Sequence, residues 1–270
     1  MKKYERIPNT ETQAALNAQQ GVTLYQIRAL IDIPEHGVKA GDVGGFIESE
    51  DNLSHEGACW IANHAVVCNQ ACVSDNALVG EGANVSGNAR ISDNAIIKSK
   101  TNITGNAQIS GNAVIHSAYF IGDNVIIADN AQINGGVTLF DDAQIRGNAV
   151  VNGTVKIGDK AQVVENSIVE GFAYVSGQAL IAGNARISGN VSISNEAIIA
   201  GHAVVLGQTR IGGAAYIDSG SFNLKPEHDK LTDIHFPALK HKSSEMHPRF
   251  EPRLKTQQQD QTKAHTTPTS

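Results

Sequence analysis

The sequence predicts an all-β chain that winds as a parallel β-helix of about nine coils. From residue 57 to residue 218 the chain repeats every six residues without an insertion or deletion, which makes 27 hexads. The fifth position of every hexad is Ile, Val or Leu, and the third is Ala or occasionally Val, Ser, Thr or Cys, except at Tyr119. An α-helix has a period of about 3.6 residues and a flat strand a period of about 2, so neither explains this repeat.

Residues 1–56 precede the repeat and are expected to form a small β cap. The segment 23–31 is rich in β-forming residues and partly alternates, which predicts a strand. The glycine-rich segment 37–45 then predicts turns. A cap is expected because an uncovered coil end would expose unpaired strand edges and the core.

The repeat itself, residues 57–219, is expected to form very short strands joined by turns. Three hexads make one coil of 18 residues with three faces, called here the first, second and third face in the order in which their strands begin at residues 60, 66 and 72. At one corner the second hexad position is Asn in seven consecutive coils, from Asn76 to Asn184. Asn tolerates the left-handed backbone region, so we expect these corners to carry positive φ and the stacked amides to form a hydrogen-bonded ladder.

Residues 220–270 lose the repeat and contain five of the seven prolines and five of the ten histidines. We expect a cap segment over the last coil, followed by a largely disordered tail.

The composition excludes several classes of protein. The formal net charge of −6 argues against a nucleic-acid binder, which needs a basic face. Three cysteines without framework spacing favour a reducing compartment. No secretory signal or membrane span is visible, so a cytoplasmic location without membrane contact is expected.

Several triplets within the repeat resemble the hexapeptide-repeat superfamily. Gly87-Asn88-Ala89 and Gly111-Asn112-Ala113 are examples, each followed by one variable residue and then Ile or Val. The resemblance implies a left-handed coil and LpxA-like trimers, and in the enzymes of the superfamily it implies acyl transfer. Residues 38–47 and 52–60 also resemble the opening of the YdcK-like group of enteric bacteria and phages, which is labelled as acyltransferases largely by fold. Fold alone does not establish function.

His116 is the candidate general base if the chain is catalytic. Superfamily acyltransferases place a catalytic His in a cleft between subunits, usually shaped by long loops. Here no hexad is interrupted, which argues against such a cleft. His116 occupies an outward position between Lys98 and Asn134 of the neighbouring coils, and Asp93 and Asp129 are the candidates to orient it.

No metal site is expected. His64, Cys68 and Cys72 have a spacing of four residues, but four extended residues cover roughly 13 Å, too far for one tetrahedral zinc ion. The histidines of the tail are more simply explained as polar residues.

An outward row on the first face is mostly apolar and predicts a subunit interface. The alternative is that β-branched residues simply suit strands. The interface candidates are Trp60, Leu78, Ile96, Val114, Val150, Ile168 and Val204.

Two functions follow as hypotheses. The first is a non-enzymatic, homo-oligomeric scaffold, a trimer by resemblance, whose cap or tail engages a protein partner. The alternative is an acyltransferase that uses acyl-CoA as a co-substrate in an inter-subunit site, with His116 as base. No other cofactor is expected, and the sequence does not identify a substrate.

Overall fold

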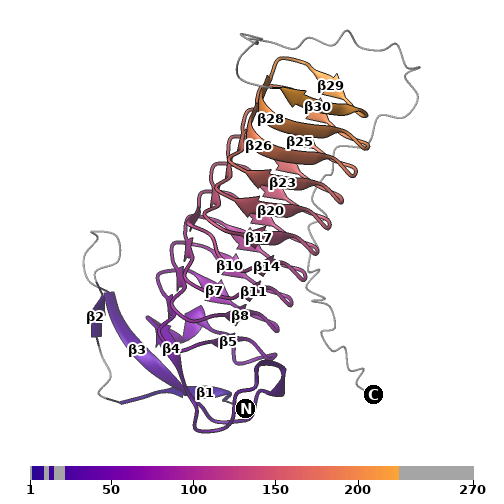
Figure 1. Ribbon diagram of the computed structural model, residues 1–270. Helices are drawn as coiled ribbons and strands as arrows, with labels where there is room; N and C mark the ends of the chain where they lie inside the picture. Colours follow the sequence, from indigo (N-terminus) through magenta and orange to yellow (C-terminus); the bar gives the residue numbers. More distant parts are fainter. Residues whose placement is uncertain (1, 9–11, 15–21, 225–270) are drawn as a thin grey trace, which may run out of the picture. The chain divides into compact units, whose positions relative to one another are not determined.

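The computed structural model describes residues 2–8, 12–14 and 22–224. Over these residues the chain is an all-β parallel β-solenoid of about ten turns, which confirms the predicted fold class (Figure 1). The described part contains no α-helix, only two short 3-10 helices, η1 (Pro34–His36) and η2 (Glu50–Asn52). No described helix is therefore long and apolar enough to cross a bilayer. The predicted tail lies, from residue 225 onward, outside the described residues.

The third face is a separate nine-stranded parallel sheet. Its strands are β7 (Cys72–Val73), β10 (Arg90–Ile91), β13 (Gln108–Ile109), β16 (Ile126–Ile127), β19 (Gln144–Ile145), β22 (Gln162–Val163), β25 (Leu180–Ile181), β27 (Ile198–Ile199) and β29 (Tyr216–Ile217).

The first and second faces join into one sheet because two strands, β26 (Arg186–Ile193) and β28 (Val204–Ile211), run around the corner between them. The other first-face strands are β5 (Trp60–Ile61), β8 (Leu78–Val79), β11 (Ile96–Ile97), β14 (Val114–Ile115), β17 (Gln132–Asn134), β20 (Val150–Gly153), β23 (Ile168–Gly171) and β30 (Ser221–Leu224). The second-face strands are β6 (Val66–Val67), β9 (Asn84–Val85), β12 (Asn102–Ile103), β15 (Phe120–Ile121), β18 (Thr138–Leu139), β21 (Lys156–Ile157) and β24 (Tyr174–Val175).

Paired strands within the repeat lie 18 residues apart in sequence. Ile96, for example, pairs with Leu78 on one side and Val114 on the other. The register shortens to 17 residues only in the last rung, where Val204 pairs with Ser221. No loop leaves the coil between these rungs, as predicted.

The N-terminal cap is an antiparallel sheet that continues into the solenoid. β1 (Tyr4–Arg6) and β2 (Thr12–Ala14) both pair with β3 (Val22–Ala29), which covers most of the strand predicted at 23–31. β3 then pairs antiparallel with β4 (Val43–Ile47), and β4 pairs in parallel with β6 as an extra first rung of the second face.

The bore of the solenoid is lined by the fifth hexad positions, and all 27 of these residues are at most 4% exposed. The exception at the third position, Tyr119, is 77% exposed, and its neighbour Ala118 takes the buried place instead. The Ala118 N–H donates to Thr101 Oγ1 at 3.2 Å, so the preceding coil accommodates this one-residue shift.

The corners carry positive φ, but the expectation that Asn at the second position adopts it was wrong. At the corner of the Asn ladder the left-handed residue is at the first position, for example Asp93 with φ of 56° and Gly111 with φ of 69°. The Asn residues form the predicted ladder: each amide donates to the amide oxygen of the next coil, with separations from 2.8 to 3.4 Å between Asn76, Asn94, Asn112, Asn130, Asn148, Asn166 and Asn184.

Candidate functional site

His116 follows β14 at the corner between the first and second faces, and its side chain is exposed. Its backbone N–H donates to Ile133 O at 2.9 Å, and its carbonyl oxygen accepts from Ser99 Oγ at 2.6 Å. The imidazole makes no hydrogen bond within the described residues. Backbone contacts therefore fix the corner, but nothing described holds the ring in one orientation.

The two carboxylates expected to orient His116 are used elsewhere. Asp93 and Asp129 lie at the corner that precedes the first-face strands, whereas His116 lies at the corner that follows them. Asp93 accepts from the Gly111 N–H and Asp129 from the Gly147 N–H, both at 2.9 Å. The structure therefore does not bring the predicted base and its candidate partners together.

The apolar row of the first face is continuous over part of its length. Leu78, Ile96 and Val114 pair on three successive rungs, and Val150 pairs with Ile168 on two more. These five residues and Val204 are partly exposed, while Gln132 and Arg186 interrupt the row. Trp60 differs because it is only 3% exposed. It packs beneath Gly44 of the cap, so its ring is not available to a second chain.

The described residues contain no group of three or more His, Cys, Asp or Glu side chains that could hold a metal ion. His64 is exposed and carries positive φ, whereas Cys68 is buried, and burial raises the pKa of its thiol to about 11.

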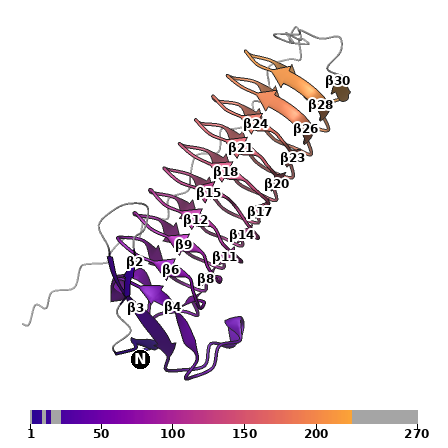
Figure 2. The same ribbon diagram turned by 60° about the vertical axis from the view of Figure 1, so that its left-hand side comes forward.

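The strands β9, β12, β15, β18, β21 and β24 follow one another along the second face of the solenoid (Figure 2). Two hollows are lined by residues of these strands and their corners. The smaller, of about 150 Å³, lies between Asn84 and Phe120. The larger is an open groove of about 660 Å³ lined by Tyr119, Gly136, Thr138, Phe140, Thr154, Lys156 and Tyr174. The exposed ring of Tyr119 thus forms one end of this groove.

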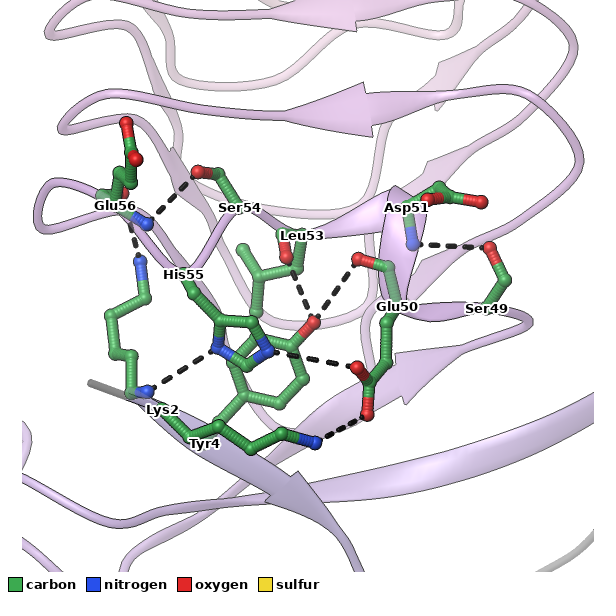
Figure 3. A network of polar contacts seen from close by, with 10 residues as sticks. Lys2, Tyr4, Ser49, Glu50, Asp51, Leu53, Ser54, His55 and Glu56 are labelled. Carbon is green, nitrogen blue, oxygen red and sulfur yellow. Dashed lines mark hydrogen bonds and ion pairs between the residues drawn. The ribbon is translucent and has the colours of Figure 1, made fainter.

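A polar network at the junction of the cap and the solenoid was not anticipated from the sequence (Figure 3). The Tyr4 hydroxyl donates to Leu53 O at 2.8 Å, and its ring stacks on His55 with 4.2 Å between centroids. Burial, and next the charge of Glu50, raise the pKa of Tyr4 far above its usual range. The phenol therefore remains a hydrogen-bond donor at any physiological pH.

His55 links this network to Glu50. The Lys3 backbone N–H donates to His55 Nδ1 at 3.3 Å, which places the proton of the neutral ring on Nε2. His55 Nε2 faces Glu50 Oε2 at 3.8 Å, and Glu50 also pairs with Lys2 Nζ at 3.0 Å. The hydrogen bond from Lys2 lowers the pKa of Glu50, opposed in part by burial.

This network resembles an acid–base set in composition but does not line a pocket. His55 Nε2 is buried and makes no hydrogen bond within the described residues, and neither of the two hollows is lined by Tyr4, Glu50 or His55. Its residues come from β1 and the two residues before it, from η2 and from the loop that follows η2, so it fastens the cap to the first coil. The sequence signals it weakly, because only folding brings Tyr4 beside residues about 50 positions later.

Comparison with known proteins found no matching family model and no curated relative. Among solved structures, the chain is similar to the UDP-N-acetylglucosamine acyltransferase of Francisella novicida, at 20% sequence identity and a TM-score of 0.22. The match covers 57% of this chain and 60% of the acyltransferase chain, so this chain spans less than two thirds of that structure. The activity named there remains a property of that protein.

Proposed function

We propose that this chain is a non-enzymatic scaffold that assembles with copies of itself through the first face of its solenoid. The observation that carries the proposal is the aliphatic row described above, in which Leu78, Ile96 and Val114 stack in register without an intervening polar residue. A partly exposed apolar row of this length is typical of an interface. A trimer is the assembly implied by the resemblance to hexapeptide-repeat proteins, and cyclic symmetry would close it.

The exposed position of His116, without a carboxylate to orient it, favours a scaffold over an enzyme. A general base needs a proton acceptor within hydrogen-bond reach of the substrate and a group that orients it. His116 is exposed at a corner, and the carboxylates of Asp93 and Asp129 accept from backbone N–H groups of other residues. The uninterrupted register also leaves no long loop to build a cleft around it.

The proposal is tested by a double substitution, Ile96→Asp with Ile168→Asp. Two carboxylates on the first face would be buried without partners in the assembly, which strongly disfavours association. We expect light scattering to give an oligomer for the unchanged protein and a mass near 28.5 kDa for the variant.

The matched control places the same charges on the third face, as Gln108→Asp with Gln144→Asp. These side chains occupy equivalent outward positions on another face. The control should keep the oligomeric mass. If the first-face variant stays oligomeric and the third-face control dissociates, the interface lies on the third face instead.

A second candidate function, acyl transfer from acyl-CoA, is favoured by the groove on the second face. Its volume falls within the range of small-molecule sites, and Lys156 supplies a cation for a phosphate while Tyr119 and Tyr174 supply apolar surface. The test is the melting temperature in acetyl-CoA, with Lys156→Ala and His116→Ala. A shift that Lys156→Ala removes, together with transferase activity that His116→Ala abolishes, would replace the scaffold with the enzyme.

A further inference from the structure

The side chains of Lys3 and Cys59 form a buried amine–thiol pair beneath the cap. Lys3 is 1% exposed and Cys59 is 0% exposed. Lys3 Nζ donates to Cys59 Sγ at 3.0 Å, and it also donates to the carbonyl oxygens of Gly57 at 3.2 Å and Glu56 at 3.4 Å. Within the described residues no carboxylate pairs with this amine, although burial of lysine is ordinarily accompanied by an ion pair.

Backbone carbonyl oxygens surround the sulfur of Cys59. Cys59 Sγ lies 3.4 Å from Ser54 O and 3.5 Å from Val73 O, and no disulfide partner is bonded to it. Burial raises the pKa of the Cys59 thiol, and the hydrogen bond from Lys3 opposes this. The sulfur is thus enclosed by carbonyl oxygens, with one amine as its nitrogen neighbour.

We propose that Lys3 and Cys59 are a redox modification site, at which molecular oxygen inserts one oxygen atom between Nζ and Sγ to give a covalent N–O–S bridge. The observed 3.0 Å separation leaves room for one bridging atom after a small approach. A direct sulfur–nitrogen bond would need a much closer approach, below even the roughly 2.0 Å of a disulfide bond.

The chemistry balances with oxygen as the oxidant. The S–H bond, two N–H bonds of the Lys3 ammonium and the O–O bond break, while the S–O and O–N bonds form. Two of the hydrogen atoms leave with the second oxygen atom as water, the third leaves as a proton, and sulfur and nitrogen each lose two electrons. A thiol reductant reverses the change by restoring the thiol and the amine and releasing the bridging oxygen as water.

The contacts of the sulfur leave little room for ordinary oxidation of cysteine. A sulfinate needs two added oxygen atoms on a sulfur that already lies 3.4 Å from Ser54 O and 3.5 Å from Val73 O. The N–O–S bridge is neutral and replaces a hydrogen bond already present. It would join the segment before β1 to the first hexad of the solenoid and so lock the cap covalently.

Intact mass and peptide mapping test the site. The full chain is divided into a sample kept under reductant without oxygen and a sample exposed to air. We expect a gain of about 14 Da in air, from one O₂ added and one water lost, carried by a cross-linked peptide pair that contains Lys3 and Cys59. Excess dithiothreitol should reverse the gain, and the bridged form should melt at a higher temperature because the cross-link restricts the unfolded chain.

Four single substitutions separate this site from general oxidation. Lys3→Met and Cys59→Ser should each abolish the gain. Lys2→Met, a neighbouring exposed lysine, and Cys68→Ser, a buried cysteine without a lysine contact, should retain it.

The proposal is overturned if the unchanged chain gains no such mass in air, or if the gain survives in Lys3→Met. It is equally overturned if mapping places only additions of about 16 or 32 Da on Cys59 without a cross-link. Mapping of the unchanged chain decides the matter even if a variant does not fold.

Discussion

The residues at the first and second hexad positions of a corner form different hydrogen bonds, because their side chains carry different donors and acceptors. Asp at the first position only accepts, and it takes the backbone N–H of the next coil, as Asp93 does from Gly111. Asn at the second position both donates and accepts, so its ladder continues from coil to coil. A second ladder shows the difference, because the run Asn88, Asn106, Asn124 ends at Asp142, whose carboxylate accepts from Asn124 but cannot donate.

His36 should make the cap sensitive to acid. Its Nε2 lies 3.0 Å from Asn76 O, and burial lowers the pKa of His36 against the opposing effects of this bond and of Glu35, while Lys3 lowers it further. Because the unfolded chain then binds a proton more readily than the folded one, stability should fall as the pH drops below about 6.5 and level off below the folded pKa.

The measurement compares denaturant midpoints at pH 7.5 and pH 5 for the unchanged chain and for His36→Gln. Gln can donate to the same carbonyl oxygen but does not titrate, so the variant should lose less stability in acid. His202→Gln, an exposed histidine at the other end of the solenoid, should retain the original pH dependence. Equal losses in all three proteins would contradict the role of His36.

Three kinds of residue adopt conformations or contacts that the sequence alone could not predict. Tyr119 is anomalous in the repeat, but only the backbone shift at Ala118 shows that its ring leaves the core. Trp60 fits the apolar row by position and is covered by Gly44 of the cap, a contact between segments that no periodicity predicts. The tolerance of Asn for the left-handed region predicts it at positive φ, whereas the adjacent Asp, Glu or Gly adopts this conformation.

At the scale of elements, a stack of glycines determines how the first face joins the second. Gly135, Gly153, Gly171, Gly189 and Gly207 have φ between 77° and 107°. This conformation coincides with longer strands at the corner, and β26 and β28 continue through it. The two-residue strands were predictable from the hexads, but these longer ones depend on the corner conformation.

Gly135→Ala should therefore be costly. A Cβ atom there would lie 2.7 Å from Gly153 O, and φ is 100°. We expect a loss of about 1–3 kcal/mol in the free energy of unfolding. Gly136→Ala is the matched control, since its nearest contact would be Thr154 Oγ1 at 3.8 Å. The control should change stability by less than about 1 kcal/mol. Similar losses for both in urea unfolding would refute the importance of the corner conformation.

At the scale of the whole molecule, the chain carries two periods with different roles. The six-residue period supplies the core and was legible in the sequence, since every fifth position is aliphatic and buried. The 18-residue period aligns the corners, the ladders and the apolar row. The cap could be expected only in outline, because its contacts with the first coil join residues distant in sequence, such as Lys3 and Cys59.

Deletions can separate these two periods. Removal of residues 141–158 takes out one coil and keeps every later residue on its own face, so we expect a folded chain with modestly reduced stability. Removal of residues 141–146 keeps the core aliphatic but turns the later faces, so that Asn130 would meet Thr154 and Gly135 would meet Asp159. Calorimetry should show a lower melting temperature for the smaller deletion. A lower melting temperature for the larger deletion would mean that the alignment of the corners contributes little to stability.

The pairing of β4 with β6 has a consequence for how the molecule is made. The cap is synthesised first, and β4 already presents a strand edge in the direction of the solenoid. The strands of each coil that leaves the ribosome can then pair with the strands of the preceding coil, which lie only 18 residues earlier in the sequence. The molecule can thus fold in the order of its translation, from the N-terminal cap towards the last coil.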